Sequence, residues 1–119
     1  MKIHITGDDE NKIAEIESEE ILLKSVQDAL DLMAECRYNH SCEKMILHGK
    51  NIIPDFFDLK TKIAGDILQK FSIYQFGLAI VGDFKKYESK SLHDFIYESN
   101  KQGQVIFVST PNEAKEKLI

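Results

Sequence analysis

Short apolar segments alternate with amphipathic segments along most of this chain, and that alternation is the strongest constraint on its fold. Residues 76–81 form a continuous apolar run, as is typical of a strand buried on both faces of a parallel sheet. Residues 59–71 instead place apolar side chains at helical spacing, with charged side chains opposite. Strands that alternate with helices indicate an α/β fold in which each helix connects two parallel strands.

The N-terminal segment has a different pattern. Residues 2–6 and 12–17 each alternate apolar and polar side chains, and Gly7 opens the turn between them, so we expect an antiparallel hairpin. The later segments predict helices and strands in alternation, at 25–38, 44–48, 55–72, 76–81, 91–102, 104–108 and from 111 onward. The expected fold is therefore α/β, with a four- or five-stranded, mostly parallel sheet, the N-terminal hairpin and about four helices.

Hydroxyl and carboxylate side chains mark the expected helix starts. Ser25, Asp55, Ser91 and Thr110 each precede a helical pattern and are predicted to cap it. A single hydrophobic core is expected from the apolar faces and central strands. Its predicted members are Ile46, Ile63, Ile67, Leu68, Phe71, Ala79, Val81, Phe95, Ile96 and Phe107.

Length and composition favour one ordinary globular domain spanning residues 1–119. The chain is 43% hydrophobic and 29% charged, and a chain of this size can bury a stable core without disulfide bonds or metal ions. Its apolar runs are too short to cross a bilayer, and its start lacks the apolar region of a signal peptide. We therefore expect no membrane contact and a cytoplasmic location.

Charge and cysteine content exclude further classes. Residues 1–49 carry 5 Lys or Arg and 11 Asp or Glu, and the whole chain has a net charge of −5, so there is no basic stripe for nucleic acid. Two cysteines do not make a disulfide framework. The spacing of Cys36, His40, Cys42 and His48 does not match structural zinc motifs, so neither a metal nor a cofactor is expected.

Four segments, at residues 25–33, 55–61, 64–71 and 92–100, resemble the bacterial family catalogued as domain of unknown function 4180. The stretches Phe-Phe-Asp-Leu-x-Thr and Glu-Ser-Asn make the resemblance specific, and it covers about residues 12–118. Lys62 stands where that family usually has glycine. The family has no established activity, so the resemblance implies no mechanism.

The order of elements resembles, more loosely, the STAS domain of anti-sigma-factor antagonists. That domain has an N-terminal hairpin followed by alternating helices and strands, with a regulatory serine where the helix after its third strand begins. The corresponding position here, 55–58, holds no serine, and Thr61 is the nearest hydroxyl. The resemblance implies a regulatory, protein-binding module without a phosphorylation switch at that position.

One candidate ligand site gathers where the parallel strands end. His48 and Asp83 follow two of these strands, and Ser89, Lys90 and Ser91 lie at a helix start, where an anion would meet backbone N–H groups. The alternative is that Ser91 only caps the helix, together with the carboxylate three residues on, while its neighbours are solvated.

A candidate protein-contact surface lies at Asp55, Phe56, Phe57, Asp58 and Thr61. Two adjacent phenylalanines at a helix start cannot both face one core, so we expect Phe57 to be partly exposed and available to a protein partner. The alternative is that one ring packs inward and the other covers the edge of the sheet, beneath a neighbouring loop.

No dinucleotide fingerprint, P-loop or nucleophile elbow occurs in the sequence. The first hypothesis is therefore a non-catalytic regulatory or protein-binding module. The alternative is a small enzyme, or a binder of anions or nucleotides, that uses the strand-end residues.

Overall fold

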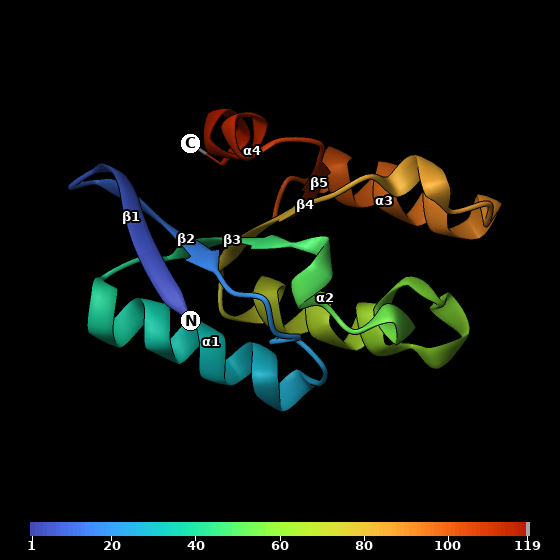
Figure 1. Cartoon of the computed structure of the whole chain (residues 1–119), viewed down its shortest axis with the longest axis horizontal. Coiled ribbons are helices and arrows are strands. Elements are labelled where there is room, and N and C mark those ends of the chain that lie inside the picture. The colour runs from blue at the N-terminus through green and yellow to red at the C-terminus, as the bar shows by residue number, and fades with distance from the viewer. Residues whose placement is uncertain (119) are drawn as a thin grey trace.

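The computed structural model describes residues 1–118 and has an α/β architecture (Figure 1). The strands are β1 (Lys2–Asp8), β2 (Asn11–Glu17), β3 (Lys44–His48), β4 (Gly77–Val81) and β5 (Val105–Val108). The α-helices are α1 (Val26–His40), α2 (Ile63–Ile73), α3 (Lys90–Gln102) and α4 (Pro111–Lys117). The predicted fold class is confirmed, with five strands in the spatial order β1-β2-β3-β4-β5.

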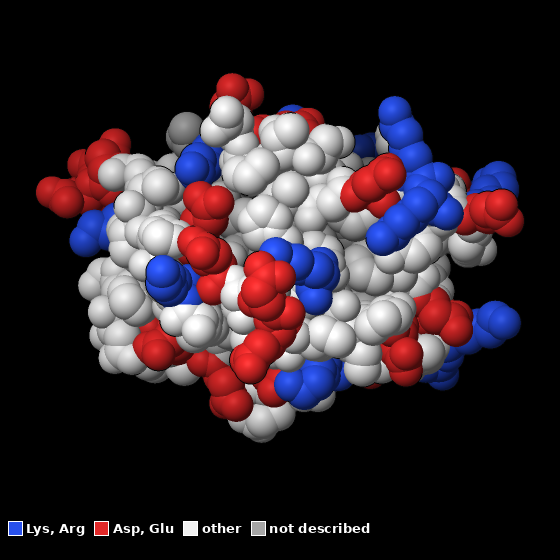
Figure 2. Space-filling model, viewed as in Figure 1, with Lys and Arg blue, Asp and Glu red and all other residues white. Residues whose placement is uncertain are grey.

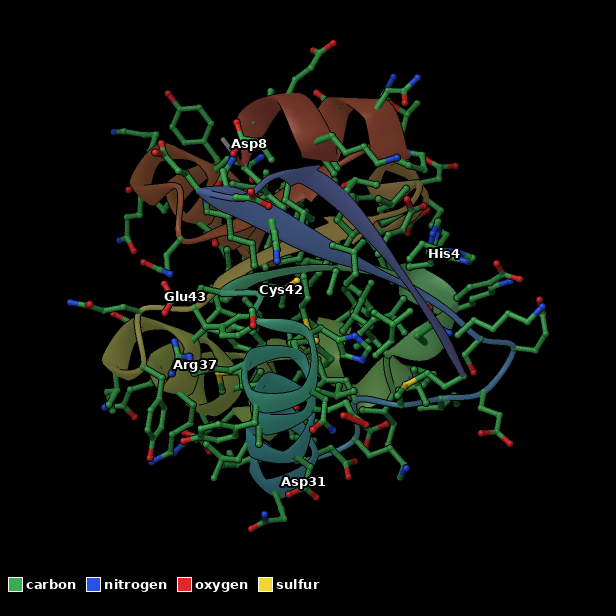
Figure 3. All side chains as sticks on the ribbon, turned by 90° about the vertical axis from the view of Figure 1, so that its left-hand side faces the viewer. His4, Asp8, Asp31, Arg37, Cys42 and Glu43 are labelled. Carbon is green, nitrogen blue, oxygen red and sulfur yellow. The ribbon has the colours of Figure 1, made fainter. Side chains whose placement is uncertain are left out.

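The sheet combines one antiparallel pair with three parallel pairs. The hairpin pairs β1 with β2 from Lys2 opposite Glu17 to Asp8 opposite Asn11, and β3, β4 and β5 then add in parallel. In the side view, β1 is the outermost strand and runs across the front of the molecule from the Asp8 end past His4 (Figure 3).

The two faces of the sheet bury separate cores, where the sequence pattern predicted one. Helices α1 and α2 cover one face and α4 covers the other, while α3 lies beside β5 (Figure 1). The larger core includes Ala14, Ile16, Met45, Leu47, Leu78, Ile80, Phe71, Ile67 and Phe107. The smaller core consists of Ile13, Ile46, Ala79, Val81, Ile106, Val108, Ala114 and Leu118. An ion pair of 3.1 Å between Lys115 Nζ and Glu15 Oε1 ties α4 to β2.

Charge is distributed unevenly over the surface. On the face shown in Figure 2, acidic side chains gather over the tip of the hairpin, residues 8–10, and over the segment that follows β2. No helix within residues 1–118 combines the length and apolar content needed to cross a membrane.

Two of the predicted helix caps are confirmed and one is shifted. Ser25 accepts a hydrogen bond from Asp28 N, and Thr110 accepts one from Glu113 N. The cap of α3 is Ser89, whose Oγ accepts from Leu92 N at 3.1 Å, and Ser91 lies inside the first turn. The prediction that Ser91 caps this helix was wrong, because Ser89 and Ser91 both place a hydroxyl just before the apolar face of α3 and the sequence pattern does not distinguish them.

The predicted helix 55–72 begins later than expected, at Ile63. Residues Pro54–Phe57 and Leu59–Thr61 form two short 3₁₀ turns, so Asp55 does not cap α2. Between the turns, Asp58 has an extended backbone (ψ 101°), which stops one continuous helix from forming. Thr61 Oγ1 donates to the carbonyls of both Asp55 and Asp58, at 2.8 Å each, and so holds the two turns together.

Lys62 joins these turns to α2 in the left-handed region, with φ 65°. An L-residue with a Cβ is disfavoured there, and glycine adopts this conformation freely. This strain explains why a glycine is the expected residue at this position.

We predict that Lys62→Gly stabilises the fold by about 0.5–1 kcal/mol, because it removes the strain of a left-handed Cβ. Chemical denaturation measures this change in the free energy of unfolding. Lys60→Gly is the matched control, since Lys60 lies in the adjacent turn without a positive φ, and it should be slightly destabilising. If Lys62→Gly lost as much stability as the control, the conclusion that the backbone at Lys62 is strained would be wrong.

The fully buried face of α2 is narrower than the sequence pattern predicted. Ile67 and Phe71 are fully buried, whereas Ile63 and Leu68 are only partly buried and pack at the margin of the larger core. Phe95 and Ile96 of α3 are also partly buried, because α3 lies beside β5 at the end of the sheet.

Burial predicts unequal costs for two neighbouring truncations. Ile67→Ala should destabilise the protein by about 2–5 kcal/mol because it leaves a cavity in the core, and Leu68→Ala should cost clearly less. Thermal or chemical unfolding measures both. Equal losses would mean that the two side chains are equally buried, contrary to the structure.

Candidate functional site

The strongest candidate site lies where β3 and β4 end side by side. His48 pairs with Val81 in the last rung of the parallel ladder, and the chain then turns away at Gly49 and Gly82. A cavity of about 380 Å³ opens beside these ends, and we call it the edge cavity. It is lined by Ile21, His48, Gly49, Lys50, Ile52, Pro54, Phe57, Val81, Gly82, Asp83, Phe84, Lys86 and Tyr87. The carboxyl edge of a parallel sheet is the usual location of ligand sites in α/β folds.

Aromatic rings form much of the wall. Phe57 and Tyr87 stack with their centroids 5.1 Å apart and their planes at 19°. Phe84 lies 6.0 Å from Phe57 and packs edge-on against Phe107 of β5. Burial raises the pKa of the Tyr87 phenol, so this ring is neutral at physiological pH. The wall is thus flat, apolar and anchored in the larger core.

A second hollow of about 530 Å³ shares the Gly82–Phe84 turn with the edge cavity. His93 and Ser109 line this second hollow, together with His48 and Asp83, which line both. Asp83 Oδ1 accepts from Lys85 N at 3.2 Å, which fixes the turn.

Gly82 has little room for a side chain. A Cβ there would approach the ring of Phe84 to 3.1 Å. The glycine therefore lets the ring fold back against the end of β4.

Three lysines surround this region. Lys50 Nζ is paired with Glu19 Oε1 at 2.9 Å. Lys85 and Lys86 have no acidic partner within 4.0 Å among residues 1–118, and Lys86 Nζ lies 5.3 Å from the centroid of the Tyr87 ring. Two carboxylates accompany these three lysines, Glu19 as the partner of Lys50 and Asp83 in the cavity lining, so the region is locally basic on an acidic chain.

A buried asparagine holds the outer wall in place. The side chain of Asn51 is fully buried, and its Nδ2 donates to the carbonyls of Ser18 and Glu20 at 2.8 and 2.9 Å. Its Oδ1 accepts from His48 N at 3.2 Å. These bonds fasten residues 18–23 to the end of β3 and place Ile21 at the rim of the cavity.

We predict that Asn51→Ala destabilises the fold by about 3 kcal/mol, because it leaves a cavity at a fully buried side chain and removes the partner of three part-buried backbone groups, the carbonyls of Ser18 and Glu20 and the N–H of His48. Asn112→Ala is the control, since Asn112 is exposed, and it should change stability by less than about 0.5 kcal/mol. Urea denaturation measures both variants. A loss at Asn51 no larger than at Asn112 would contradict the role assigned to this amide.

The structure brings together part of the predicted ligand site. His48 and Asp83 lie on the same two cavities, as expected from their positions after β3 and β4. Ser89, Lys90 and Ser91 line neither cavity. Ser89 is occupied as the cap of α3, and Lys90 Nζ lies 2.8 Å from Asp94 Oδ2. That hydrogen bond raises the pKa of Lys90.

Other site residues were not predicted from the sequence. Lys50, Lys86 and Tyr87 lie in connecting segments to which the sequence pattern gave no role, and His93 lies in the predicted helix 91–102 without being singled out. For the three residues of the connecting segments the signal was positional, because they follow Gly49 and Gly82, the glycines at the ends of β3 and β4. His93 is held by a hydrogen bond of 2.6 Å from its Nε2 to the carbonyl of Tyr87.

The expected exposure of Phe57 is wrong. Its side chain is only 7% exposed, and Phe56 is fully buried. The two rings meet edge-on at 5.0 Å. Phe56 packs near Phe107 of β5, while Phe84 and Tyr87, from the loop after β4, cover Phe57, so neither ring is left to solvent. Asp55, Asp58 and Thr61 are exposed, and their contact with a protein partner stays a prediction.

The cysteines lie away from this site. Cys36, on the buried face of α1, and Cys42, just after this helix, are buried free thiols, and burial raises the pKa of Cys36 to about 12. Within residues 1–118, no group of three or more His, Cys, Asp or Glu side chains is arranged to hold a metal ion.

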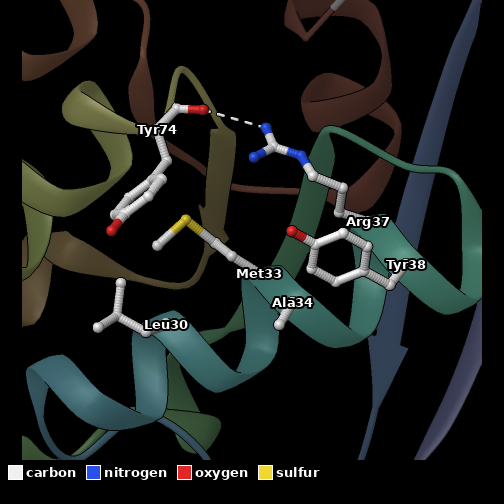
Figure 4. A pocket seen from close by; sticks show the side chains of 6 residues that line it. All are labelled: Leu30, Met33, Ala34, Arg37, Tyr38 and Tyr74. Carbon is white, nitrogen blue, oxygen red and sulfur yellow. Dashed lines mark hydrogen bonds between the residues drawn. The ribbon is translucent and has the colours of Figure 1, made fainter.

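A smaller hollow of about 180 Å³ lies between α1 and the end of α2 (Figure 4). It is lined by Leu30, Met33, Ala34, Arg37, Tyr38 and Tyr74. Arg37 Nη2 donates to the carbonyl of Tyr74 at 3.0 Å and so bridges the two helices. This hollow has room for little more than one side chain.

Comparisons with known proteins identify a family and no characterised relative. A family model described as "Domain of unknown function (DUF4180)" matches residues 8–118. No curated protein matches the chain, and no solved structure matches it.

Proposed function

The chain belongs to the DUF4180 family, and from the geometry of the edge cavity we propose that it binds a small organic anion at the carboxyl ends of β3 and β4. The proposal concerns binding, and it assigns no reaction to these residues.

The observation that carries the proposal is the local reversal of charge. The chain has a net charge of −5, yet Lys86 in the edge cavity and Lys85 in the adjoining second hollow have no acidic partner within 4.0 Å among residues 1–118. Only Asp83 contributes negative charge to the lining, and its Oδ1 already caps the turn. Unpaired lysines beside a concave surface attract an anion and raise its local concentration there.

The walls indicate the body of the ligand. Phe84, Tyr87, Ile52 and Val81 contribute apolar surface to the cavity. A cavity of about 380 Å³ falls within the range of small-molecule sites, which are mostly apolar with a few polar groups. A flat apolar body that carries one carboxylate or phosphate group fits both features.

The buried Phe57 also favours this proposal over a protein-contact surface at 55–61. That surface rested on an exposed ring, and the ring instead forms part of the cavity wall. The strand-end ligand site, the alternative from the sequence, gains the geometric support that the protein-contact surface loses.

A titration followed by amide NMR tests the proposal with two probes. Inorganic phosphate supplies the anionic group alone, and phenylphosphonate adds a flat ring. We expect both to shift the amides of Gly49, Gly82 and Lys86, with tighter binding of phenylphosphonate because its ring lies on the aromatic wall. Replacing both lysines, as Lys85→Gln with Lys86→Gln, should weaken binding at least about fivefold.

Lys101→Gln is the matched control, because Lys101 lies at the far end of α3 and lines no cavity described above. It should leave both titrations unchanged. Absence of shifts near Gly82 at millimolar phenylphosphonate, or equal weakening by the control, would overturn the proposal.

A further inference from the structure

The two edges of the sheet differ in how their outer backbone groups are satisfied. At β5, the side-chain amide of Asn100 pairs with Phe107, accepting from its N–H at 2.7 Å and donating to its carbonyl at 3.3 Å. Ser99 Oγ donates to the carbonyl of Val105. The Glu-Ser-Asn stretch of α3 thus closes this edge, and no further strand can add to it.

The opposite edge, at β1, is open. Strand β1 hydrogen-bonds to β2 on one side, and within residues 1–118 no helix, loop or side chain bonds to its outer backbone. Ile5, at the middle of the strand, is 42% exposed. Figure 3 shows β1 lying across the front of the molecule with its outer edge uncovered. An open edge strand of seven residues is a template for another strand.

The sequence of β1 is complementary to itself. In an antiparallel pair related by a two-fold axis, paired residues share a face, so one residue must lie opposite its own copy. The register that pairs the whole strand is centred on Ile5. It places Lys2 of each copy opposite Asp8 of the other and Ile3 opposite Gly7. Opposite charges at both ends favour this register over shifted ones.

We propose that β1 is the contact surface for a second copy of this chain, joined by antiparallel β1–β1 pairing into one continuous sheet. Although the whole chain is acidic, β1 carries one lysine and one aspartate at its two ends. In the proposed dimer Lys2 of each copy meets Asp8 of the other, so like charges are not brought together along the strand. The edge cavity lies at β3 and β4, so this inference stands independently of the proposed ligand.

The oligomeric state tests this inference. We expect light scattering coupled to size-exclusion chromatography to give twice the 13.7 kDa chain mass at about 100 µM. Ile5→Lys and Ile5→Glu should each give a monomer, because each places like charges opposite one another at the axis. Mixing the two variants should restore a dimer, because opposite charges then meet there.

Ile73→Lys is the control, since Ile73 is exposed on α2 beside the α1–α2 hollow. It should remain dimeric, and circular dichroism checks that every variant is folded. A monomeric wild-type chain at this concentration would overturn the inference and indicate that the charges on β1 block strand addition. Dissociation by Ile73→Lys, or a mixture of the Ile5 variants that stays monomeric, would also overturn it.

Discussion

The hydrogen bonds of the Asn51 side chain are the constraint on which the candidate site depends. This buried amide joins the segment after β2 to the end of β3, and its own backbone carbonyl accepts from both Leu22 and Leu23. Leaving this buried amide without hydrogen-bond partners would reduce the stability of the fold, so the position of Asn51 fixes the position of the segment after β2. The outer wall of the edge cavity is therefore set by one side chain outside the cavity's lining.

The inner wall depends on a helix that begins late. The two 3₁₀ turns at 54–61 direct Phe56 and Phe57 toward the sheet, and Thr61 fastens both turns with one hydroxyl. Phe57 then stacks with Tyr87, which follows β4. Segments after two neighbouring strands thus form one aromatic surface. The strain at Lys62 accompanies this arrangement.

The architecture was predictable because it rests on periodicity. Five strands, four helices and the N-terminal hairpin follow from apolar spacing, and the caps at Ser25 and Thr110 follow from local chemistry. Periodicity carries no signal for a 3₁₀ turn of three or four residues, so the predicted start of α2 was wrong. The predicted exposure of Phe57 was wrong because Phe84 and Tyr87, which follow β4, cover its ring.

The site was only partly predictable for a related reason. His48 and Asp83 were found because strand ends can be read from the sequence, and topology brings those ends together. Asn51 was missed because a buried polar side chain has no periodic pattern, and its partners lie about 30 residues away in the chain. The lysines and rings of the cavity come from loops, whose arrangement depends on tertiary packing.

The central claim is that the edge cavity holds an organic anion, and a crystal structure grown with phenylphosphonate tests it most directly. The account predicts the phosphonate group beside Lys86 and Gly82, with its ring against the wall formed by Tyr87 and Phe84. An empty edge cavity, or phenylphosphonate bound only in the α1–α2 hollow, would contradict the account.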